Sequence, residues 1–213
     1  IKQTSDESEL ITVNLSDGSE LTCTKYHKFY IQSDDNVLTV EAQHLMKGMK
    51  IITCQYPVID NLENKQTNKN DIPINSSLKN KIAWISNFAD KYANITNSNS
   101  VEFTLSDKRK LLDIKLMLQT CGTNSRIQKK DNNYTLLIAS NELQKLIELG
   151  FSPNRLIINN NNPQRNAVHF VKIENITDNN RKDKTFCFTE PKRHAGIFNG
   201  VITSQCTEII EYS

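Results

Sequence analysis

The chain has 213 residues, and its 26 basic and 24 acidic side chains leave a formal net charge of +2. A chain so close to neutrality lacks the concentrated basic face that a dedicated DNA-binding protein usually shows. No apolar run is as long as a membrane span and no signal-peptide pattern is visible, so the sequence encodes neither membrane insertion nor secretion. We therefore expect a cytoplasmic protein of one or two domains.

The cysteines predict a reducing compartment. Their number is odd, and no two of them have the CxxC spacing of a zinc or redox site. The sequence therefore predicts no disulfide framework and no metal site. The five residues are Cys23, Cys54, Cys121, Cys187 and Cys206.

The first 57 residues have the alternating pattern of β-strands. Leu10–Leu15 and Glu20–Thr24 predict a hairpin whose turn contains Gly18, which is free to adopt a positive φ. At the end of the second strand Thr24 precedes His27 by three residues. A hydroxyl and an imidazole can share a pocket there, and imidazole can donate a proton to a leaving amide nitrogen near neutral pH. The alternative is an ordinary strand-end histidine.

Two polar stretches, residues 58–80 and Asn159–Pro163, predict solvated linkers around an inserted segment. Between them the spacing of apolar residues becomes helical, so an α+β domain is predicted inside a β-rich chain. Its predicted elements are a helix over Leu78–Tyr92, a strand over Val101–Leu105, a helix over Lys108–Leu118 capped by Ser106 and Asp107, strands over Arg126–Gln128 and Tyr134–Ile138, and a helix over Glu142–Leu149 capped by Ser140 and Asn141.

The remaining residues return to a β pattern. Ala167–Ile173 alternates as a strand, and His169 within it is interpreted as a packing residue. Phe186–Phe188 predicts a further half-buried strand around Cys187. Asn199 and Gly200 form a strong hairpin-turn signal before a β-branched strand.

Gln205 and Cys206 place an amide side chain next to a thiol. An amide side chain can attack its own main-chain carbonyl and break the bond that follows it, and a thiolate can accept an acyl group. His194 lies in the same stretch, which suggests peptide-bond rearrangement. The alternative is a buried cysteine that follows a polar residue in an ordinary hairpin.

This C-terminal stretch resembles the C-terminal splicing motifs of inteins, which have a strand with Asp or Cys, then His, Asn-Gly, an apolar strand and a terminal amide residue. Residues 16–52 resemble the second intein block, with a DG hairpin, a T-x-x-H motif and a tail at Val40–Gly48, after which Met49 replaces the usual Asp. The resemblance implies a mainly β, horseshoe-like Hint splicing domain. It implies catalytic roles for Thr24, His27, Cys187, His194, Gln205 and Cys206.

Inteins also carry an upstream nucleophile in a first block that precedes the T-x-x-H motif, and no residue of this chain matches it. Two explanations stay open. The sequence is truncated, which we favour because Ile1 begins within a strand pattern, or the first block belongs to a separate chain, as in split inteins.

Residues 206–213 resemble the active-site segment of the large subunit of ribonucleoside-diphosphate reductase, in which a Cys-x-Glu pair carries radical chemistry. Cys206 and Glu208 occupy those two positions. The resemblance implies that Gln205 ends the intein and that Cys206 begins the downstream extein.

The inserted segment resembles one repeat of a LAGLIDADG homing endonuclease. Trp84–Ile95 lies where the family has W-L-A-G-F-L-D-A-D-G-S-I. Asp90 keeps the first aspartate of the motif, but Tyr92 replaces the second, which is the usual ligand of Mg²⁺. Only one motif is visible, whereas a monomeric enzyme needs two. We therefore expect a degenerate endonuclease; a small α+β domain without nuclease ancestry is the alternative.

The predicted function is autocatalytic splicing of the chain out of a reductase large subunit. Splicing needs no cofactor, and Mg²⁺ would matter only for an active endonuclease. The expected partners are the flanking exteins, the missing N-terminal segment in cis or in trans, and DNA only if the endonuclease is active. The alternatives are an active homing endonuclease and a plain reductase fragment. The predicted domains are 1–57 and 166–205 for splicing, 58–165 for the insertion and 206–213 for the extein.

Overall fold

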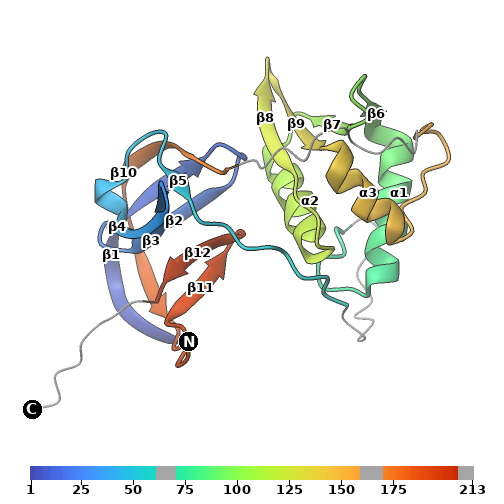
Figure 1. Cartoon of the computed structure of the whole chain (residues 1–213). Coiled ribbons are helices and arrows are strands. Elements are labelled where there is room, and N and C mark those ends of the chain that lie inside the picture. The colour runs from blue at the N-terminus through green and yellow to red at the C-terminus, as the bar shows by residue number, and fades with distance from the viewer. Residues whose placement is uncertain (61–70, 159–169, 206–213) are drawn as a thin grey trace, which may run out of the picture. The chain divides into compact units, whose positions relative to one another are not determined.

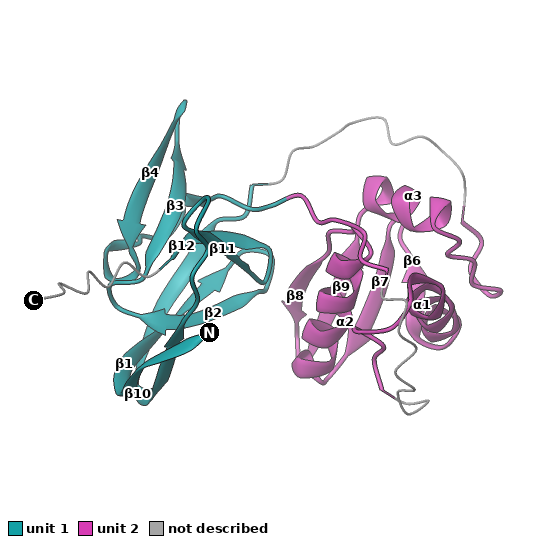
Figure 2. Ribbon diagram, turned by 90° about the horizontal axis from the view of Figure 1, so that it is seen from below, with its two compact units in different colours: residues 1–54, 169–213 teal, residues 55–168 magenta. Residues whose placement is uncertain are grey.

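The computed structural model describes residues 1–60, 71–158 and 170–205. The chain forms two compact units (Figure 2). One contains residues 1–54 together with the segment from 169 onward, and the other contains residues 55–168. The first unit is therefore built from two segments that are distant in the sequence. Among the described residues, no helix is both long and apolar enough to cross a membrane.

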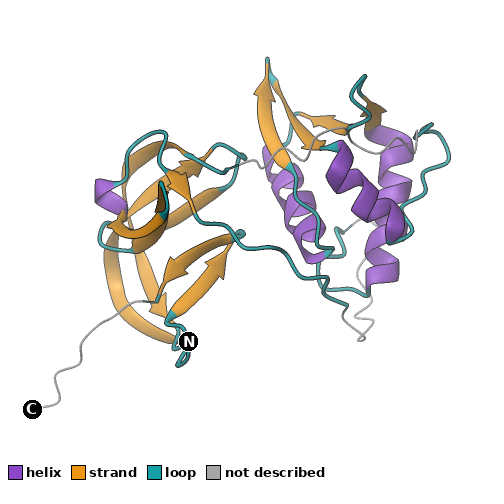
Figure 3. Cartoon of the chain, in the orientation of Figure 1, coloured by secondary structure: helices purple, strands orange, loops and turns teal. Residues whose placement is uncertain are grey.

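The first unit consists of strands and contains two sheets (Figures 1 and 3). One sheet has the order β10–β1–β2, and the other has the order β11–β12–β3–β4, with β5 also pairing with β3. Buried side chains between them include Val13, Phe29 and Ile173. The strands are β1 (Lys2–Leu15), β2 (Glu20–Thr24), β3 (Lys28–Ser33), β4 (Asn36–Glu41), β5 (Lys50–Ile51), β10 (Ile173–Cys187), β11 (Ala195–Phe198) and β12 (Val201–Ser204), with a 3-10 helix over Ala42–His44.

Both predicted hairpins are present. β1 and β2 pair antiparallel up to Asn14 and Glu20, and Gly18 in the turn between them has a φ of 81°. β11 and β12 pair up to Phe198 and Val201. Their turn residues Asn199 and Gly200 have φ values of 48° and 81°, as a two-residue hairpin turn with left-handed central residues requires.

The chain leaves the first unit and returns to it at adjacent points. The backbone amide of Ile51 donates to the carbonyl of Val171 over 2.9 Å, and Lys50 forms a bridge with Lys172. On the outgoing side the amide of Cys54 donates to the carbonyl of Gly200 over 3.0 Å. The second unit therefore interrupts the first between two backbone segments that are paired with each other.

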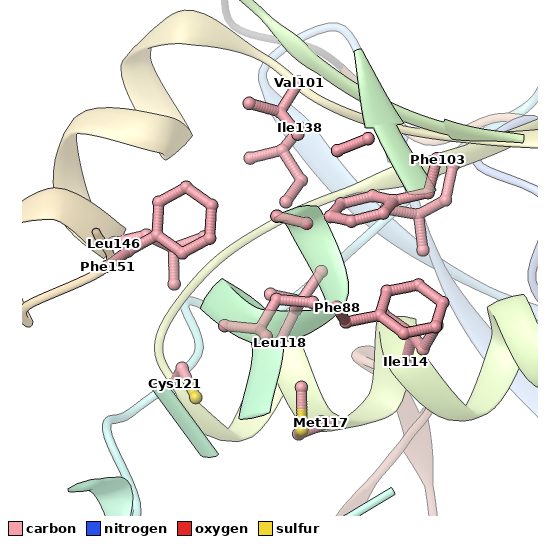
Figure 4. Packing of buried hydrophobic residues seen from close by; sticks show 14 of the residues in the cluster. Phe88, Val101, Phe103, Ile114, Met117, Leu118, Cys121, Ile138, Leu146 and Phe151 are labelled. Carbon is pink, nitrogen blue, oxygen red and sulfur yellow. The ribbon is translucent and has the colours of Figure 1, made fainter. Parts of the chain in front are cut away.

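The second unit is an antiparallel sheet of order β6–β7–β9–β8 with three helices on one face (Figure 1). The buried cluster between sheet and helices includes Phe103, Ile114, Leu118 and Leu146, which are fully buried (Figure 4). The elements are α1 (Leu78–Tyr92), β6 (Ala93–Ile95), β7 (Val101–Leu105), α2 (Lys108–Thr120), β8 (Arg126–Lys130), β9 (Asn133–Ile138) and α3 (Ser140–Glu148).

The predicted linker over residues 58–80 is wrong at both of its described ends. The amide of Ile59 donates to the carbonyl of Thr120 over 2.8 Å, and the fully buried ammonium of Lys81 donates to the carbonyl of Ile59 over 2.8 Å. Beyond residues 61–70, Ile72 and Ile74 pack against the hydrophobic core of the second unit. The apolar residues among the polar ones therefore anchor this stretch. Residues 61–70 and the second predicted linker, Asn159–Pro163, lie outside the described residues.

Three further expectations need correction. The predicted strand over Ala167–Ile173 is confirmed only at its end, where Lys172 forms a bridge with Lys50 and β10 begins at Ile173, while residues 170 and 171 have no strand assignment. The last helix begins at Ser140 rather than Glu142, with Ala139 as its N-cap, because β9 leads almost directly into it. The prediction also missed strand β6, which pairs with β7 immediately after α1.

Candidate active site

A cavity of 1260 Å³ lies within the first unit, with walls from β1, β2, β10, β11 and the turn after β2. Four of the predicted catalytic residues line it. Two of them, Thr24 and His27, come from the N-terminal segment, and the other two, Cys187 and Gln205, come from the C-terminal segment. The fold therefore brings these four side chains to one cavity across more than 150 positions of sequence.

The turn between β2 and β3 positions Thr24 and His27. The amide of His27 donates to the carbonyl of Thr24 over 3.1 Å, which closes the turn, and the His27 carbonyl accepts from the amide of Ala42 over 2.8 Å. Within the turn, the Lys25 ammonium lies 3.0 Å from Glu9 and 3.2 Å from Asp178. The hydrogen bond that Lys25 donates to Glu9 is the main cause that raises the pKa of Lys25. The turn is thus fixed to β1 and β10.

His27 has the environment of a neutral imidazole. Its ring meets Phe29 edge-on, with centroids 5.3 Å apart and ring planes at 83°. Burial lowers the pKa of His27 below the usual 6.5, so the ring is mostly uncharged at pH 7. A neutral imidazole has one donor and one acceptor nitrogen and can therefore move a proton in either direction. Among the described residues, no hydrogen bond joins this ring to the Thr24 hydroxyl.

Two hydrogen bonds hold Gln205 at the end of β12. Its backbone amide donates to the carbonyl of His194 over 2.7 Å, and its side-chain oxygen Oε1 accepts from the amide of Glu190 over 2.8 Å. No described residue accepts a hydrogen bond from the side-chain nitrogen Nε2. The amide group is therefore oriented by its oxygen, while its nitrogen is free of partners within the described chain.

Glu190, which the sequence reasoning missed, organises the loop that contacts Gln205. Its carboxylate accepts hydrogen bonds from the amides of Lys192, over 3.1 Å, and Arg193, over 2.5 Å. The bond from Arg193 is the main cause that lowers the pKa of Glu190. The sequence Glu190-Pro191 was the available signal, because an acidic residue before proline at the start of a turn can accept from the amides that follow.

The other predicted residues have different placements. Cys187 ends β10, half-buried, with its thiol 3.5 Å from the carbonyl of Phe188. The His194 side chain is exposed and does not line the cavity, so its contact with Gln205 is made by the backbone carbonyl. Cys206 and Glu208 lie outside the described residues, as does His169.

The wall next to Cys187 is shaped by a glycine. A Cβ atom on Gly196 of β11 would overlap the ring of Phe188, which packs across this position. The same ring contacts Phe198, with centroids 5.7 Å apart. Glycine at position 196 therefore allows the ring of Phe188, just after β10, to pack closely against β11. This contact joins the two ends of the loop over residues 188–194.

In the second unit, the motif residues Asp90 and Tyr92 lie at the end of α1. The oxygens of Asp90 accept from the amide of Arg155 over 2.7 Å and from the side chain of Asn154 over 3.1 Å. Tyr92 packs against Phe88, with centroids 4.6 Å apart, and its side chain is 46% exposed. Within the described chain, no group of three His, Cys, Asp or Glu residues has the arrangement of a metal site.

Comparison with known proteins gives two matches. A family model for the LAGLIDADG-like domain matches residues 89–149. The ribonucleoside-diphosphate reductase large subunit of Invertebrate iridescent virus 6 is 28% identical over 308 aligned positions, which cover 99% of this chain and 32% of the relative. The chain thus spans about a third of that relative's length. Since the alignment has 308 positions and this chain 213 residues, at least 95 positions are occupied only in the relative.

The two matches are consistent with each other. The alignment to the reductase large subunit extends across the LAGLIDADG-like domain, so the similarity does not stop at the edges of the insertion. A chain that combines this domain with similarity to a reductase large subunit fits an intein inside a ribonucleoside-diphosphate reductase.

Proposed function

We propose that the first unit is a Hint-type splicing domain that excises the chain from a ribonucleoside-diphosphate reductase large subunit. The observation that carries this proposal is the single cavity lined by Thr24 and His27 from one segment and Cys187 and Gln205 from the other. Splicing acts on two peptide bonds that are distant in the sequence and must meet in space. A cavity that joins both ends of an interrupted β unit meets that requirement.

The proposed reaction at the downstream junction is an intramolecular attack by the side chain of Gln205. Its nitrogen Nε2 forms a bond to the main-chain carbonyl carbon of the same residue, and the bond from that carbon to the nitrogen of Cys206 breaks. A proton from Nε2 passes to the leaving amine, so a six-membered glutarimide and a free N-terminal cysteine result. The hydrogen bond from Glu190 to Oε1 supports this step, because it orients the amide and leaves Nε2 available.

At the upstream junction, we propose that His27 and Thr24 assist the transfer of the N-extein to the nucleophile of the first intein block. The neutral imidazole accepts the proton of the attacking nucleophile and then, as imidazolium, donates it to the departing amide nitrogen; its lowered pKa favours the neutral form that can accept this proton. Before Gln205 cyclises, the thiol of Cys206 takes over the acyl group. Once cyclisation has freed the amine of Cys206, the resulting thioester rearranges to a peptide bond. The reductase flanks are the proposed exteins, and none of these steps requires a metal.

The experiment follows the bond after Gln205. The full chain is fused through Ser213 to a tag protein, and release of the tag is measured by mass spectrometry. We expect a tag that begins at Cys206 and a partner fragment lighter by one water than the hydrolysis product. Gln205→Asn should preserve or accelerate release, because the smaller ring freezes one torsion fewer. Gln205→Ala should abolish it, whereas Gln43→Ala, at an exposed glutamine on the 3-10 helix, should have no effect.

Gln205→Glu distinguishes the loss of the nucleophilic nitrogen from a loss of the local structure. It keeps an oxygen that can accept from Glu190 but removes the nucleophilic nitrogen, so we expect a folded protein without release. Undiminished release from Gln205→Ala would show that this bond is not a splice junction. His194→Ala is expected to slow release more than His169→Ala, because alanine adopts the left-handed φ of 51° at this position less readily than histidine, and the His194 carbonyl holds the Gln205 amide.

The second candidate function, a DNA endonuclease, is favoured by the LAGLIDADG-like match but opposed by the motif residues. Tyr92 offers a phenol in place of a carboxylate, and both oxygens of Asp90 already accept hydrogen bonds. Purified protein with Mg²⁺ and a reductase gene that lacks the insertion should therefore give no site-specific cleavage. Cleavage of that gene would establish the endonuclease.

A further inference from the structure

Gln205 is held twice by the same short loop. The carbonyl of His194 accepts from its backbone amide, and the amide of Glu190 donates to its side-chain oxygen. The two contacts come from Glu190 and His194, which form the two ends of the loop and are separated by three residues. The geometry of the Gln205 side chain therefore depends on the conformation of this loop.

The loop has little other support. Its residues from Glu190 to His194 are exposed or half-buried and contribute nothing to the hydrophobic core. His194 also has a φ of 51°, a left-handed conformation that costs a non-glycine residue about 1 kcal/mol or more. Without an internal constraint, such a loop would sample many conformations.

The Glu190 carboxylate supplies that constraint. It accepts from the amides of Lys192 and Arg193, one on each oxygen, and so folds the loop back onto its own first residue. The groups that act on it are the backbone amides of Lys192, Arg193 and His194 and the His194 side chain, and the strand end that contacts the loop contributes the uncharged Gln205. Hydrogen bonds to an ionised acceptor are the stronger kind, which suits an exposed position.

We propose that Glu190 is a positioning residue for cleavage after Gln205, because its carboxylate fixes the loop that orients the Gln205 side-chain amide. The carboxylate does not touch the reacting atoms, and the loop that it fixes contacts Gln205, so its effect is confined to the downstream junction. The proposal rests on the splicing function proposed above. It adds a residue that none of the sequence motifs marked.

The test compares Glu190→Ala, Glu190→Gln and Glu174→Ala in the full chain fused to a C-terminal tag. Glu174 is an exposed glutamate on β10 and serves as the matched control. Glu190→Ala should slow tag release by roughly ten- to a hundredfold, since a misplacement of about 1 Å can cost that much in an intramolecular step. Glu190→Gln keeps one acceptor oxygen and should lose only about threefold, and Glu174→Ala should match the unmodified chain.

A second measurement separates positioning from general damage. With an upstream intein block supplied in trans, cleavage at the upstream junction by added thiol should proceed at the unmodified rate in Glu190→Ala. Equal losses at both junctions would instead mean that the variant damages the whole unit and would overturn the proposal.

A third measurement does not depend on splicing at all. Hydrogen exchange at the Gln205 amide should become more than tenfold faster in Glu190→Ala, because the His194 carbonyl is no longer held in place. Unchanged exchange would refute the positioning role, even if no version of the chain released its tag. Faster exchange in a chain that never releases its tag would keep the positioning role and refute the proposed function.

Discussion

The carboxylate of Asp90, the surviving acid of the endonuclease-like motif, accepts the backbone amide of Arg155 over 2.7 Å. Arg155 lies 65 positions later, and its guanidinium donates back to the carbonyls of Asp90, Ala89 and Ala93 at the end of α1. Asp90 and Arg155 thus close the second unit by joining its first helix to its last described segment. A residue type that holds metal in the related motif here holds the fold together.

The first prediction is that Asp90 stabilises the second unit and does not bind Mg²⁺. Asp90→Ala should lower the midpoint of thermal unfolding of this unit, because the amide of Arg155 and the side chain of Asn154 lose their acceptor. Asp113→Ala, which removes only a surface pair with Arg109, should have a smaller effect. Mg²⁺ should leave the midpoint of the unmodified chain unchanged; a rise that depends on Asp90 would contradict the structural role.

The second prediction concerns the stability of the second unit at acidic pH. The amide of Arg155 is the main cause that lowers the pKa of Asp90 below the usual 3.8. The folded state therefore favours the ionised form, and the resulting stability is fully present above 3.8 and is lost as the pH falls through the lowered pKa. Unfolding midpoints measured between neutral pH and pH 3 should converge for Asp90→Asn and the unmodified chain at the acid end. A constant difference across the range would refute the assignment.

The third prediction is that the first unit folds without the second. Replacing residues 55–169 by about six glycine and serine residues should leave a soluble protein with β-type circular dichroism, because Ile51 and Val171 are already paired at the junction. As a control, a deletion that also removes residues 50–54 takes away that pairing and should be less stable. An aggregated product from the first deletion would mean that the two units depend on each other.

The helices and tight turns of this chain could be predicted from the sequence because their signals are local. The spacing of Ile82, Ile85 and Phe88 fixes α1, and Asn199-Gly200 fixes its hairpin. The long strand β10 could not be predicted, because its polar residues Asp178–Lys184 pair with β1 through the backbone and face water. Burial of an alternating face is what reveals a strand in a sequence, and this one has almost none.

The residues of the candidate site also fall into two groups, those that the sequence motifs predicted and those that they did not. Thr24, His27, Cys187 and Gln205 were singled out by sequence motifs, and the structure brings them to one cavity, although their catalytic roles stay predictions. Glu190 was missed because its hydrogen bonds run to backbone amides, which any sequence at 192 and 193 would offer. The exposure of His194 was missed because a motif position does not reveal where a side chain points.

The fourth prediction concerns His27. Burial lowers its pKa, so the folded protein binds this proton at a lower pH than the unfolded chain does. Between the lowered value and 6.5 the unfolded state holds more protons, and stability should therefore rise with pH across that window. Proton NMR of the imidazole, assigned with His27→Gln, should show a midpoint below 6.5. A midpoint at or above 6.5 would contradict the half-buried, neutral ring.

The fifth prediction concerns the glycine beneath Phe188. Gly196→Ala should destabilise the first unit by about 1–3 kcal/mol, as overpacking usually does, and should slow cleavage after Gln205 by displacing the loop that starts at this ring. Val37→Ala, at an exposed position on β4 that does not line the cavity, is the control. Adding Phe188→Ala to Gly196→Ala should remove much of the penalty. Equal loss in the double variant would place the cause elsewhere.

The pairing of Ile51 with Val171 also determines how much sequence the first unit can carry between its halves. The entropy lost on closing a loop grows only with the logarithm of its length, by about 0.6 kcal/mol for each doubling. A junction whose ends are held together by their own backbone bonds is therefore almost indifferent to the size of what lies between them. By this estimate, insertions at this junction can shrink, grow or decay over evolution at little cost to the β unit.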